Sequence, residues 1–291
     1  MIQKASQRLN VIARHKHKFP RLALERLYTT MVRPIIEYGD TIYDGMPLFL
    51  AQSLEKVQRR AAIICTGAYR HTETQTLLRE VGWEPLSERR RKHKLAVLHK
   101  IQSGVYPPYL RDLIPVATEP QYSLRSVSRI PFIACRLSTT YNSFIPSTIR
   151  MWNNLPQNVV DAQSSSHFKN LLQGHSVRNI YNTLCTGRSG IWLSRMRMGL
   201  STLGQHRFNY NLIENACCSN CGDAETTFHY FFVCRSYSHQ RTVMYNALAD
   251  QNHDINNKNN LLNIILFGNT PNKVDLLEVI YTYMRTTQRF K

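Results

Sequence analysis

The sequence is short of acidic residues and has no long apolar run. It holds 37 lysines and arginines against 19 aspartates and glutamates, which gives a net charge of +18. A surplus of this size favours a polyanionic partner, and nucleic acid fits it better than an acidic membrane surface. No stretch reaches the roughly 20 apolar residues of a membrane helix, and the N-terminal residues lack the apolar core of a secretion signal. We therefore expect an intracellular protein, nuclear or cytoplasmic, with no membrane partner.

Patterns of several common functional sites are also missing. Gly187 and Gly190 are close together, but no lysine follows them, so the chain has no glycine-rich phosphate loop. Nothing in the sequence supports pairing Cys185 with a histidine for nucleophilic catalysis. The seven cysteines, four of them near His229, are more typical of a reducing compartment with a metal site than of a disulfide framework.

The most informative pattern is a set of four potential zinc ligands with the spacing C-x2-C-x7-H-x4-C. The four residues are Cys218, Cys221, His229 and Cys234. Tetrahedral zinc prefers four sulfur or nitrogen ligands, and a set of four leaves no position open for water or substrate. The spacing therefore predicts a structural Zn2+ site, and a group of buried cysteines beside a core histidine is the less favoured alternative.

Local geometry supports this interpretation of the pattern. A two-residue gap lets one tight turn present both thiolates, and Gly222 tolerates the left-handed backbone that such a turn requires. The four-residue gap before Cys234 suits one helical turn. Cys217 is adjacent to Cys218 and is an alternative first ligand.

Hydrophobic periodicity predicts a mainly α protein with four segments. Residues 1–104 have the pattern of a helical bundle, and residues 105–185 that of an irregular, proline-rich connector with short helices. Residues 186–250 form the zinc module, and residues 251–291 an asparagine-rich polar loop followed by an amphipathic helix.

Two long helices are expected between Pro20 and Gly67. One begins at Pro20, ends at Gly39 and is kinked at Pro34, with Leu24, Leu27, Tyr28, Met31 and Ile35 on its apolar face. The other runs from Pro47 to Gly67. Thr72 and Gln75 fit a capping box for a third, shorter helix that ends at Gly82. A fourth helix is expected from Pro85 to about Ser103, with Val97, Leu98 and Ile101 on its apolar side.

Basic residues cluster in two places that suit contacts with a phosphate backbone. The first cluster includes Arg59, Arg60, Arg89, Arg90 and Lys94, and the second includes Arg195, Arg197 and Arg207. If two helices of the bundle pack antiparallel, the first cluster forms one electropositive groove. The run at residues 89–94 is alternatively a solvated helix face or a nuclear import signal.

Several segments, in their order along the chain, resemble the region after the palm in LINE-type (non-LTR) retrotransposon reverse transcriptases. The matching stretches are RPIIEYG at 33–39, LEKVQRRAA at 54–62, PL and ERR at 85–90, SFIP at 143–146, WNNLP at 152–156 and RMRMG at 195–199, together with the C-C-H-C pattern with Glu225 and the terminal Arg289-Phe290. The resemblance covers essentially the whole chain. It implies that residues 1–104 are a thumb-like bundle and that the zinc module binds element RNA or target DNA.

The chain departs from this family in its catalytic parts. Those polymerases hold two magnesium ions with paired aspartates, and this sequence contains no Asp-Asp dipeptide. The resemblance implies that fingers and palm would lie upstream of Met1 and that this chain is not itself an enzyme. We expect a non-catalytic nucleic-acid-binding fragment, whose partners are RNA, DNA and the missing polymerase portion. The alternatives are a protein–protein adaptor and a transposon remnant without a selected function.

Overall fold

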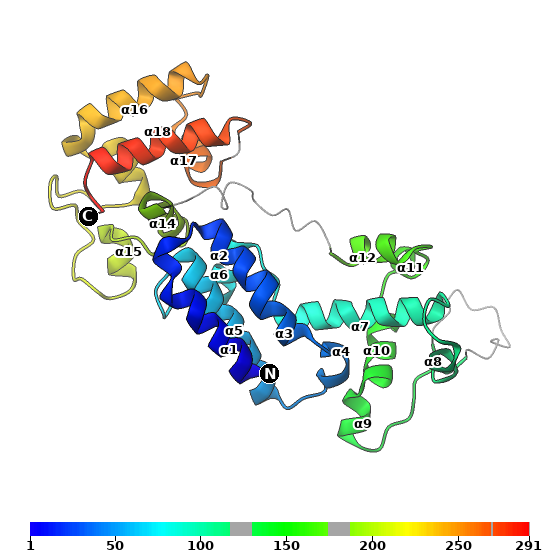
Figure 1. The fold of residues 1–291 in the computed structure, drawn as a ribbon. Coiled ribbons are helices and arrows are strands. Elements are labelled where there is room, and N and C mark those ends of the chain that lie inside the picture. The colour runs from blue at the N-terminus through cyan, green and yellow to red at the C-terminus, as the bar shows by residue number, and fades with distance from the viewer. Residues whose placement is uncertain (117–129, 174–186, 269, 291) are drawn as a thin grey trace. The chain divides into compact units, whose positions relative to one another are not determined.

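The computed structural model describes residues 1–116, 130–173, 187–268 and 270–290 (Figure 1). These residues form helices and no β-strand, with one isolated antiparallel bridge between Cys217 and Ala224. The prediction of a mainly α protein is confirmed for this part of the chain. No helix within it is long and apolar enough to cross a membrane.

The helices are mostly short. Those before the first gap are α1 (Ile2–Arg14), α2 (Arg21–Leu27), α3 (Arg33–Glu37), α4 (Asp40–Tyr43), α5 (Leu48–Thr66), α6 (Thr74–Val81), α7 (Leu86–Gln102) and α8 (Pro108–Asp112). Between the gaps lie α9 (Ser138–Asn142), α10 (Phe144–Asn153), α11 (Gln157–Val160) and α12 (Ser165–Gln173). The last group is α14 (Gly187–Arg197), α15 (Gly204–Asn209), α16 (Ser238–Asp250), α17 (Lys258–Phe267) and α18 (Lys273–Thr286).

The chain divides into two compact units, each assembled from separate stretches of sequence. The first unit comprises Met1–Gln7, Met31–Gln58 and Glu84–Val177, and the second comprises Arg8–Thr30, Arg59–Trp83 and Arg178–Lys291. These units cross the segment boundaries expected from the sequence. For example, α7 from the expected bundle packs against α10 and α12 from the expected connector. The proline-rich segment thus supplies part of a core.

An aromatic stack forms the centre of the first unit. The rings of His99 and Phe168 are stacked with centroids 4.4 Å apart, and the Phe168 and Trp152 centroids are 5.5 Å apart. His99 Nε2 lies 2.9 Å from the Ala162 carbonyl oxygen. Leu95 and Leu98 of α7 are fully buried against this stack. One face of α7 therefore carries the apolar residues that hold α10 and α12.

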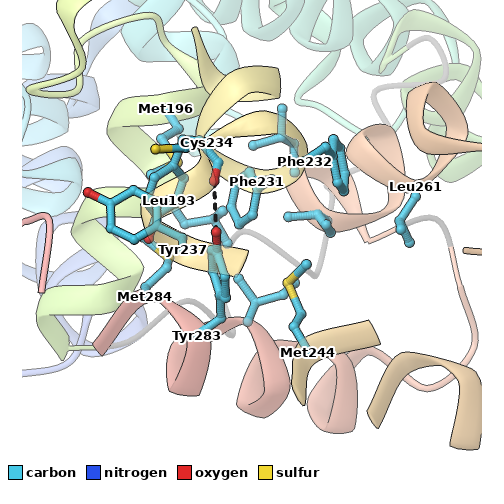
Figure 2. Close-up of a cluster of buried hydrophobic side chains, with 14 of the residues drawn as sticks. Leu193, Met196, Phe231, Phe232, Cys234, Tyr237, Met244, Leu261, Tyr283 and Met284 are labelled. Atoms are coloured by element: carbon cyan, nitrogen blue, oxygen red, sulfur yellow. Dashed lines mark hydrogen bonds between the residues drawn. The ribbon is translucent and has the colours of Figure 1, made fainter. Parts of the chain in front are cut away.

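The core of the second unit gathers the metal-ligand segment together with α14, α16, α17 and α18 (Figure 2). Leu193 and Met196 enter it from α14, Met244 from α16, and Tyr283 and Met284 from α18. Residues 186–250 and 251–291, expected to be separate segments, thus share one core. Helix α16 was not expected from the sequence, because its apolar positions do not form a clear stripe.

The helix expected between Pro20 and Gly39 forms in three consecutive pieces. Helix α2 is followed by a π-turn, Tyr28–Val32, and then by α3. Pro34 is in the first turn of α3 and has no amide hydrogen to donate to a carbonyl of the preceding turn. The sequence predicted a kink at Pro34, and the structure has a π-turn that ends two residues before it, at Val32.

The π-turn changes which residues are buried after it. An extra residue rotates the following positions by about 100° relative to an unbroken α-helix. As a result Val32 and Ile36 are buried, Ile35 is only half-buried, and Met31 is 41% exposed. The expectation that Met31 and Ile35 lie on the apolar face was wrong for this reason.

Glycines end the next two helices as expected. Gly67 follows α5 with a φ of +66°, and Gly82 follows α6 with a φ of +65°. The expected capping box does not form, because the Thr72 hydroxyl donates to the Tyr69 carbonyl and Glu73 occupies the N-cap position. A capping box requires both side chains to point at the backbone of the helix start, and the spacing of Thr72 and Gln75 alone does not determine where they point.

Candidate metal centre

The first two cysteines of the pattern lie on a tight turn closed by backbone hydrogen bonds. The Gly222 amide donates to the Cys218 carbonyl at 2.9 Å, and the Cys218 amide donates to the Asp223 carbonyl at 2.7 Å. Gly222 has a φ of +80°, a left-handed conformation that glycine adopts without steric cost. The turn expected from the C-x2-C-G spacing is therefore present.

The other two residues of the pattern lie at the ends of a π-turn, His229–Val233. The Cys234 amide donates to the His229 carbonyl, five residues back, at 2.9 Å. At the start of the turn, the His229 amide donates to the Thr226 hydroxyl at 2.9 Å. One helical turn does bring both side chains together, as expected, and its five-residue period matches the spacing better than an α-turn would.

These two turns place four ligand atoms at one point. The ligand atoms of Cys218, Cys221, His229 and Cys234 all lie within 4.8 Å of one another. The Cys218 and Cys234 sulfurs are 3.9 Å apart, and the Cys221 sulfur is 3.3 Å from His229 Nε2. In a tetrahedral zinc site with bonds of about 2.0–2.3 Å, ligand atoms lie roughly 3.3–3.8 Å apart. The arrangement fits such an ion, and the exposed Cys217 lies outside it.

Most of the cluster is buried, and at Cys234 the burial disfavours the charged thiolate. Cys218 and His229 are 3% and 4% exposed, and Cys234 is fully buried. Burial raises the pKa of the Cys234 thiol to about 11, and the neighbouring Cys218 contributes to the rise. A divalent cation would supply the positive charge that stabilises deprotonated thiols. The four residues can thus bind a metal ion, and they would fill a tetrahedral shell without leaving an open position.

Two helices outside the ligand segment hold its backbone in place. From α16, Arg241 Nε donates to the Phe231 carbonyl at 2.9 Å, and the same guanidinium bonds the Cys234 carbonyl. From α18, the Tyr283 hydroxyl donates to the Tyr230 carbonyl at 2.7 Å (Figure 2). These supports were missed in the sequence, because no local spacing links Arg241 or Tyr283 to the ligands.

Most aromatic rings near the ligands are core residues. Tyr230 and Phe231 are fully buried and make edge-to-face or stacked contacts with each other and with Tyr283. Phe232 is 4% exposed and stacks on Tyr245. Tyr210 is different, because it is 48% exposed. The buried rings hold the module together and are not available to stack on bases.

The basic run at the start of α7 is neutralised within the first unit. Arg90 and Lys94 each pair with Asp44 at 2.9 Å, and Arg89 pairs with Glu37. The rest of the run is paired as well: Arg91 with Glu88, Lys92 with Glu84, and His93 with Asp40. Arg90 and Lys94 are only 4% and 1% exposed. The expectation that these two contact phosphate is corrected, because Asp44 holds both inside the fold.

Arg197 is likewise committed to an internal ion pair, in the second unit. Its side chain is 1% exposed and bonds the carboxylate of Glu80, which also pairs with Arg21 at 2.8 Å. Burial alone would raise the pKa of Glu80, but the charges and hydrogen bonds of Arg197 and Arg21 outweigh it and lower that pKa. Arg197 is therefore a structural residue, and its expected role as a phosphate contact is corrected too.

Two of the predicted residues are half-buried and hydrogen-bonded to backbone carbonyls. Arg195 donates to the Gly67 carbonyl at 2.7 Å and stacks on the ring of Tyr69, 4.7 Å from its centroid. Arg59 donates to the carbonyls of Arg70 and Thr72. A guanidinium held in this way keeps its charge at the surface with little freedom to move.

The last two predicted residues are exposed. Arg60 and Arg207 make no side-chain hydrogen bond or ion pair with the described residues, and both face solvent. Of the eight predicted phosphate contacts, these two have the geometry of free cations. Comparison of the chain with protein-family models, with curated proteins and with solved structures found no match.

Proposed function

We propose that this chain is a non-catalytic nucleic-acid-binding protein that holds RNA or DNA by its phosphate backbone. In this proposal the Cys218, Cys221, His229 and Cys234 cluster binds a structural Zn2+ that stabilises the second unit. The observation that carries the proposal is this compact four-ligand cluster in a chain of net charge +18. A basic surplus of that size favours binding to a polyanion such as RNA or DNA, and small zinc modules commonly carry the cations that bind it.

The resemblance to LINE-type reverse transcriptases supplies the biological setting of the proposal. In those polymerases the thumb holds the template–primer duplex, and the region after it binds element RNA or target DNA. We propose the same roles here, with the catalytic portion on another part of such an element. No residue of this chain is proposed to catalyse a reaction.

Arg207 lies in the part of the second unit best suited to bind bases as well as phosphates. It is exposed on α15 beside Phe208 and close to Tyr210, which are 44% and 48% exposed. Aromatic rings next to a free guanidinium can stack on unpaired bases while the cation binds the backbone. The half-buried Arg59 and Arg195 add positive charge without being free to move. Arg60 supplies a second exposed cation.

A salt titration tests the proposal. The zinc-loaded chain is mixed with labelled single-stranded and duplex RNA and DNA, and the binding constant is measured over a series of potassium chloride concentrations. If about six phosphates are contacted, the logarithm of the binding constant should fall against the logarithm of salt with a slope of about −5.

The same titration separates nucleic-acid binding from the adaptor alternative. Docking of a protein helix depends mainly on apolar area and changes little with salt. A chain that binds none of the four nucleic acids at low salt would contradict the proposal.

A further inference from the structure

The second unit contains a recess whose lining, as far as the structure describes it, carries positive charge and no carboxylate. It lies among residues 16–24, residues 63–68 at the end of α5, and residues 187–195 of α14. Its volume is about 640 Å3, within the range of roughly 300–1,000 Å3 for sites that hold small ligands. Neither the metal cluster nor the exposed end of α15 contributes to it.

Two of the cations at the recess, Lys16 and Arg188, have no internal partner among the described residues. Both are exposed and form no hydrogen bond or ion pair with the described part of the chain. Arg195 completes the set and is fixed in place by the Gly67 carbonyl. Arg21 also lines the recess, but its charge is matched by Glu25 and Glu80. The local field is therefore positive and is not cancelled by an acid at the surface of the recess.

The rest of the lining combines apolar side chains with the hydroxyls of Thr66 and Ser194, and it includes one half-exposed ring. Leu24, Ile63 and Ile191 line the recess together with Ala68, and Phe19 is 45% exposed beside Lys18. An exposed aromatic ring over aliphatic side chains is the surface on which a planar base stacks. Double-stranded nucleic acid cannot use such a surface, because its bases are paired and stacked inside the helix.

We infer that this recess receives one unstacked base and its phosphate from a single-stranded segment of the bound nucleic acid, with the base against Phe19 and the phosphate between Lys16 and Arg188. The inference rests on the proposed function and extends it to a preference for single strands. Sequence specificity is not part of it, since the two buried hydroxyls of the lining, Thr66 and Ser194, already donate to the Ala62 carbonyl and to Glu80. Arg195 completes the positive rim.

The test compares two pairs of charge removals in the full zinc-loaded chain. The recess variant carries Lys16→Ala and Arg188→Ala, and the matched control carries Lys18→Ala and Arg70→Ala. All four cations are exposed in the second unit, but only the first two line the recess. Binding of a fluorescent oligouridylate and of a fluorescent RNA hairpin duplex is measured by anisotropy at one fixed salt concentration.

We expect the recess variant to bind the oligouridylate at least about tenfold more weakly than the control, with both binding the duplex equally well. Phe19→Leu keeps the apolar contact, removes the aromatic face and should weaken oligouridylate binding about fivefold with no change for the duplex. Circular dichroism and thermal melting of each variant should match the wild type, because the changed side chains are exposed.

Three outcomes would overturn the inference. If the control weakens single-strand binding as much as the recess variant, the charge acts diffusely and the recess has no special role, while the proposed function stands. If free uridine monophosphate competes as well as the oligouridylate at equal nucleotide concentration, the occupant is a free nucleotide. If the wild-type chain binds neither probe, the proposed function fails together with the inference.

Discussion

Glu225 and Arg289, 64 residues apart, form a two-pronged ion pair in which Arg289 Nε and Nη2 donate to the Glu225 carboxylate at 2.6 and 2.7 Å. The same carboxylate accepts the Gly204 amide at 2.6 Å, and Arg289 also donates to the Thr202 carbonyl at 3.0 Å. Glu225 lies between the cysteine turn and His229, so this pair fastens the metal-binding segment to the last residues of the chain. A parallel two-pronged bond between guanidinium and carboxylate is among the stronger and more directional side-chain interactions.

Replacement of Glu225 by alanine should destabilise the second unit. The change leaves the Arg289 guanidinium without its carboxylate and the buried Gly204 amide without an acceptor. Loss of one partner from a buried pair costs about 3–5 kcal/mol. Urea unfolding of the zinc-loaded chain measures the effect. Arg285→Ala is the control, since Arg285 is exposed on α18 and its one hydrogen bond to a described residue is to a carbonyl of its own helix. Equal unfolding midpoints for the two variants would show that the pair contributes nothing.

Loss of a metal ligand should release the ion and unfold the ligand segment. In Cys221→Ser or His229→Ala, the remaining ligands are too few for a structural zinc site, whose apparent binding free energy is about 10–16 kcal/mol at neutral pH. We expect the zinc content to fall from one equivalent to near zero, with loss of near-ultraviolet dichroism from the buried tyrosines. Cys217→Ser is the matched control, because Cys217 is the exposed neighbour outside the cluster. A Cys221→Ser chain that retains a full equivalent of zinc would show that the ligands are misassigned.

The metal cluster could be predicted from the sequence because its geometry is local. Gly222 and the short gaps on either side of it determine where the two thiolates point, and a single turn joins His229 to Cys234. No contact between distant residues is needed to predict that the four side chains meet. Helix ends at Gly67 and Gly82 were predictable for the same reason, since a left-handed residue is a local requirement.

The roles of the basic residues could not be predicted from the sequence, because an ion pair depends on a partner far along the chain. Arg90 and Asp44 are 46 residues apart, and Arg197 and Glu80 are 117 residues apart. A sequence shows that arginine is plentiful, but it does not show which arginines the fold neutralises. The π-turn before Pro34 was hidden in a similar way, since an apolar pattern at α-helical spacing does not reveal where an extra residue will be accommodated.

Acidification should weaken the second unit through Glu80. The pKa of this carboxyl is lower in the folded chain than its ordinary value of 4.5, so it binds a proton more readily after unfolding. Its contribution to stability is complete above pH 4.5 and is lost as the pH falls through the lowered folded pKa. Glu80→Gln should be less stable than the wild type at neutral pH, and the difference should narrow steadily below pH 4.5. Urea unfolding midpoints measured across this range provide the check, and a constant difference would contradict the assignment.

Removal of Arg90 should lower stability but not nucleic-acid binding, and removal of Arg60 should do the reverse. The comparison separates cations that stabilise the fold from cations that bind nucleic acid. Arg90 is buried against Asp44, so Arg90→Ala should lower the free energy of unfolding by about 3 kcal/mol and leave the salt slope of nucleic-acid binding unchanged in the folded protein. Arg60 is exposed and unpaired among the described residues, so Arg60→Ala should leave stability within about 0.5 kcal/mol of the wild type and reduce the slope by about one unit. Arg207→Ala should behave like Arg60→Ala, because the guanidinium of Arg207 is exposed as well.

Unfolding in urea and binding across a salt series, measured on the same preparations, give the stability and the salt slope for each variant. If Arg90→Ala reduces the salt slope without reducing stability, Arg90 contacts the nucleic acid after all. If the slope is unchanged in both Arg60→Ala and Arg207→Ala, the two exposed cations do not contact it.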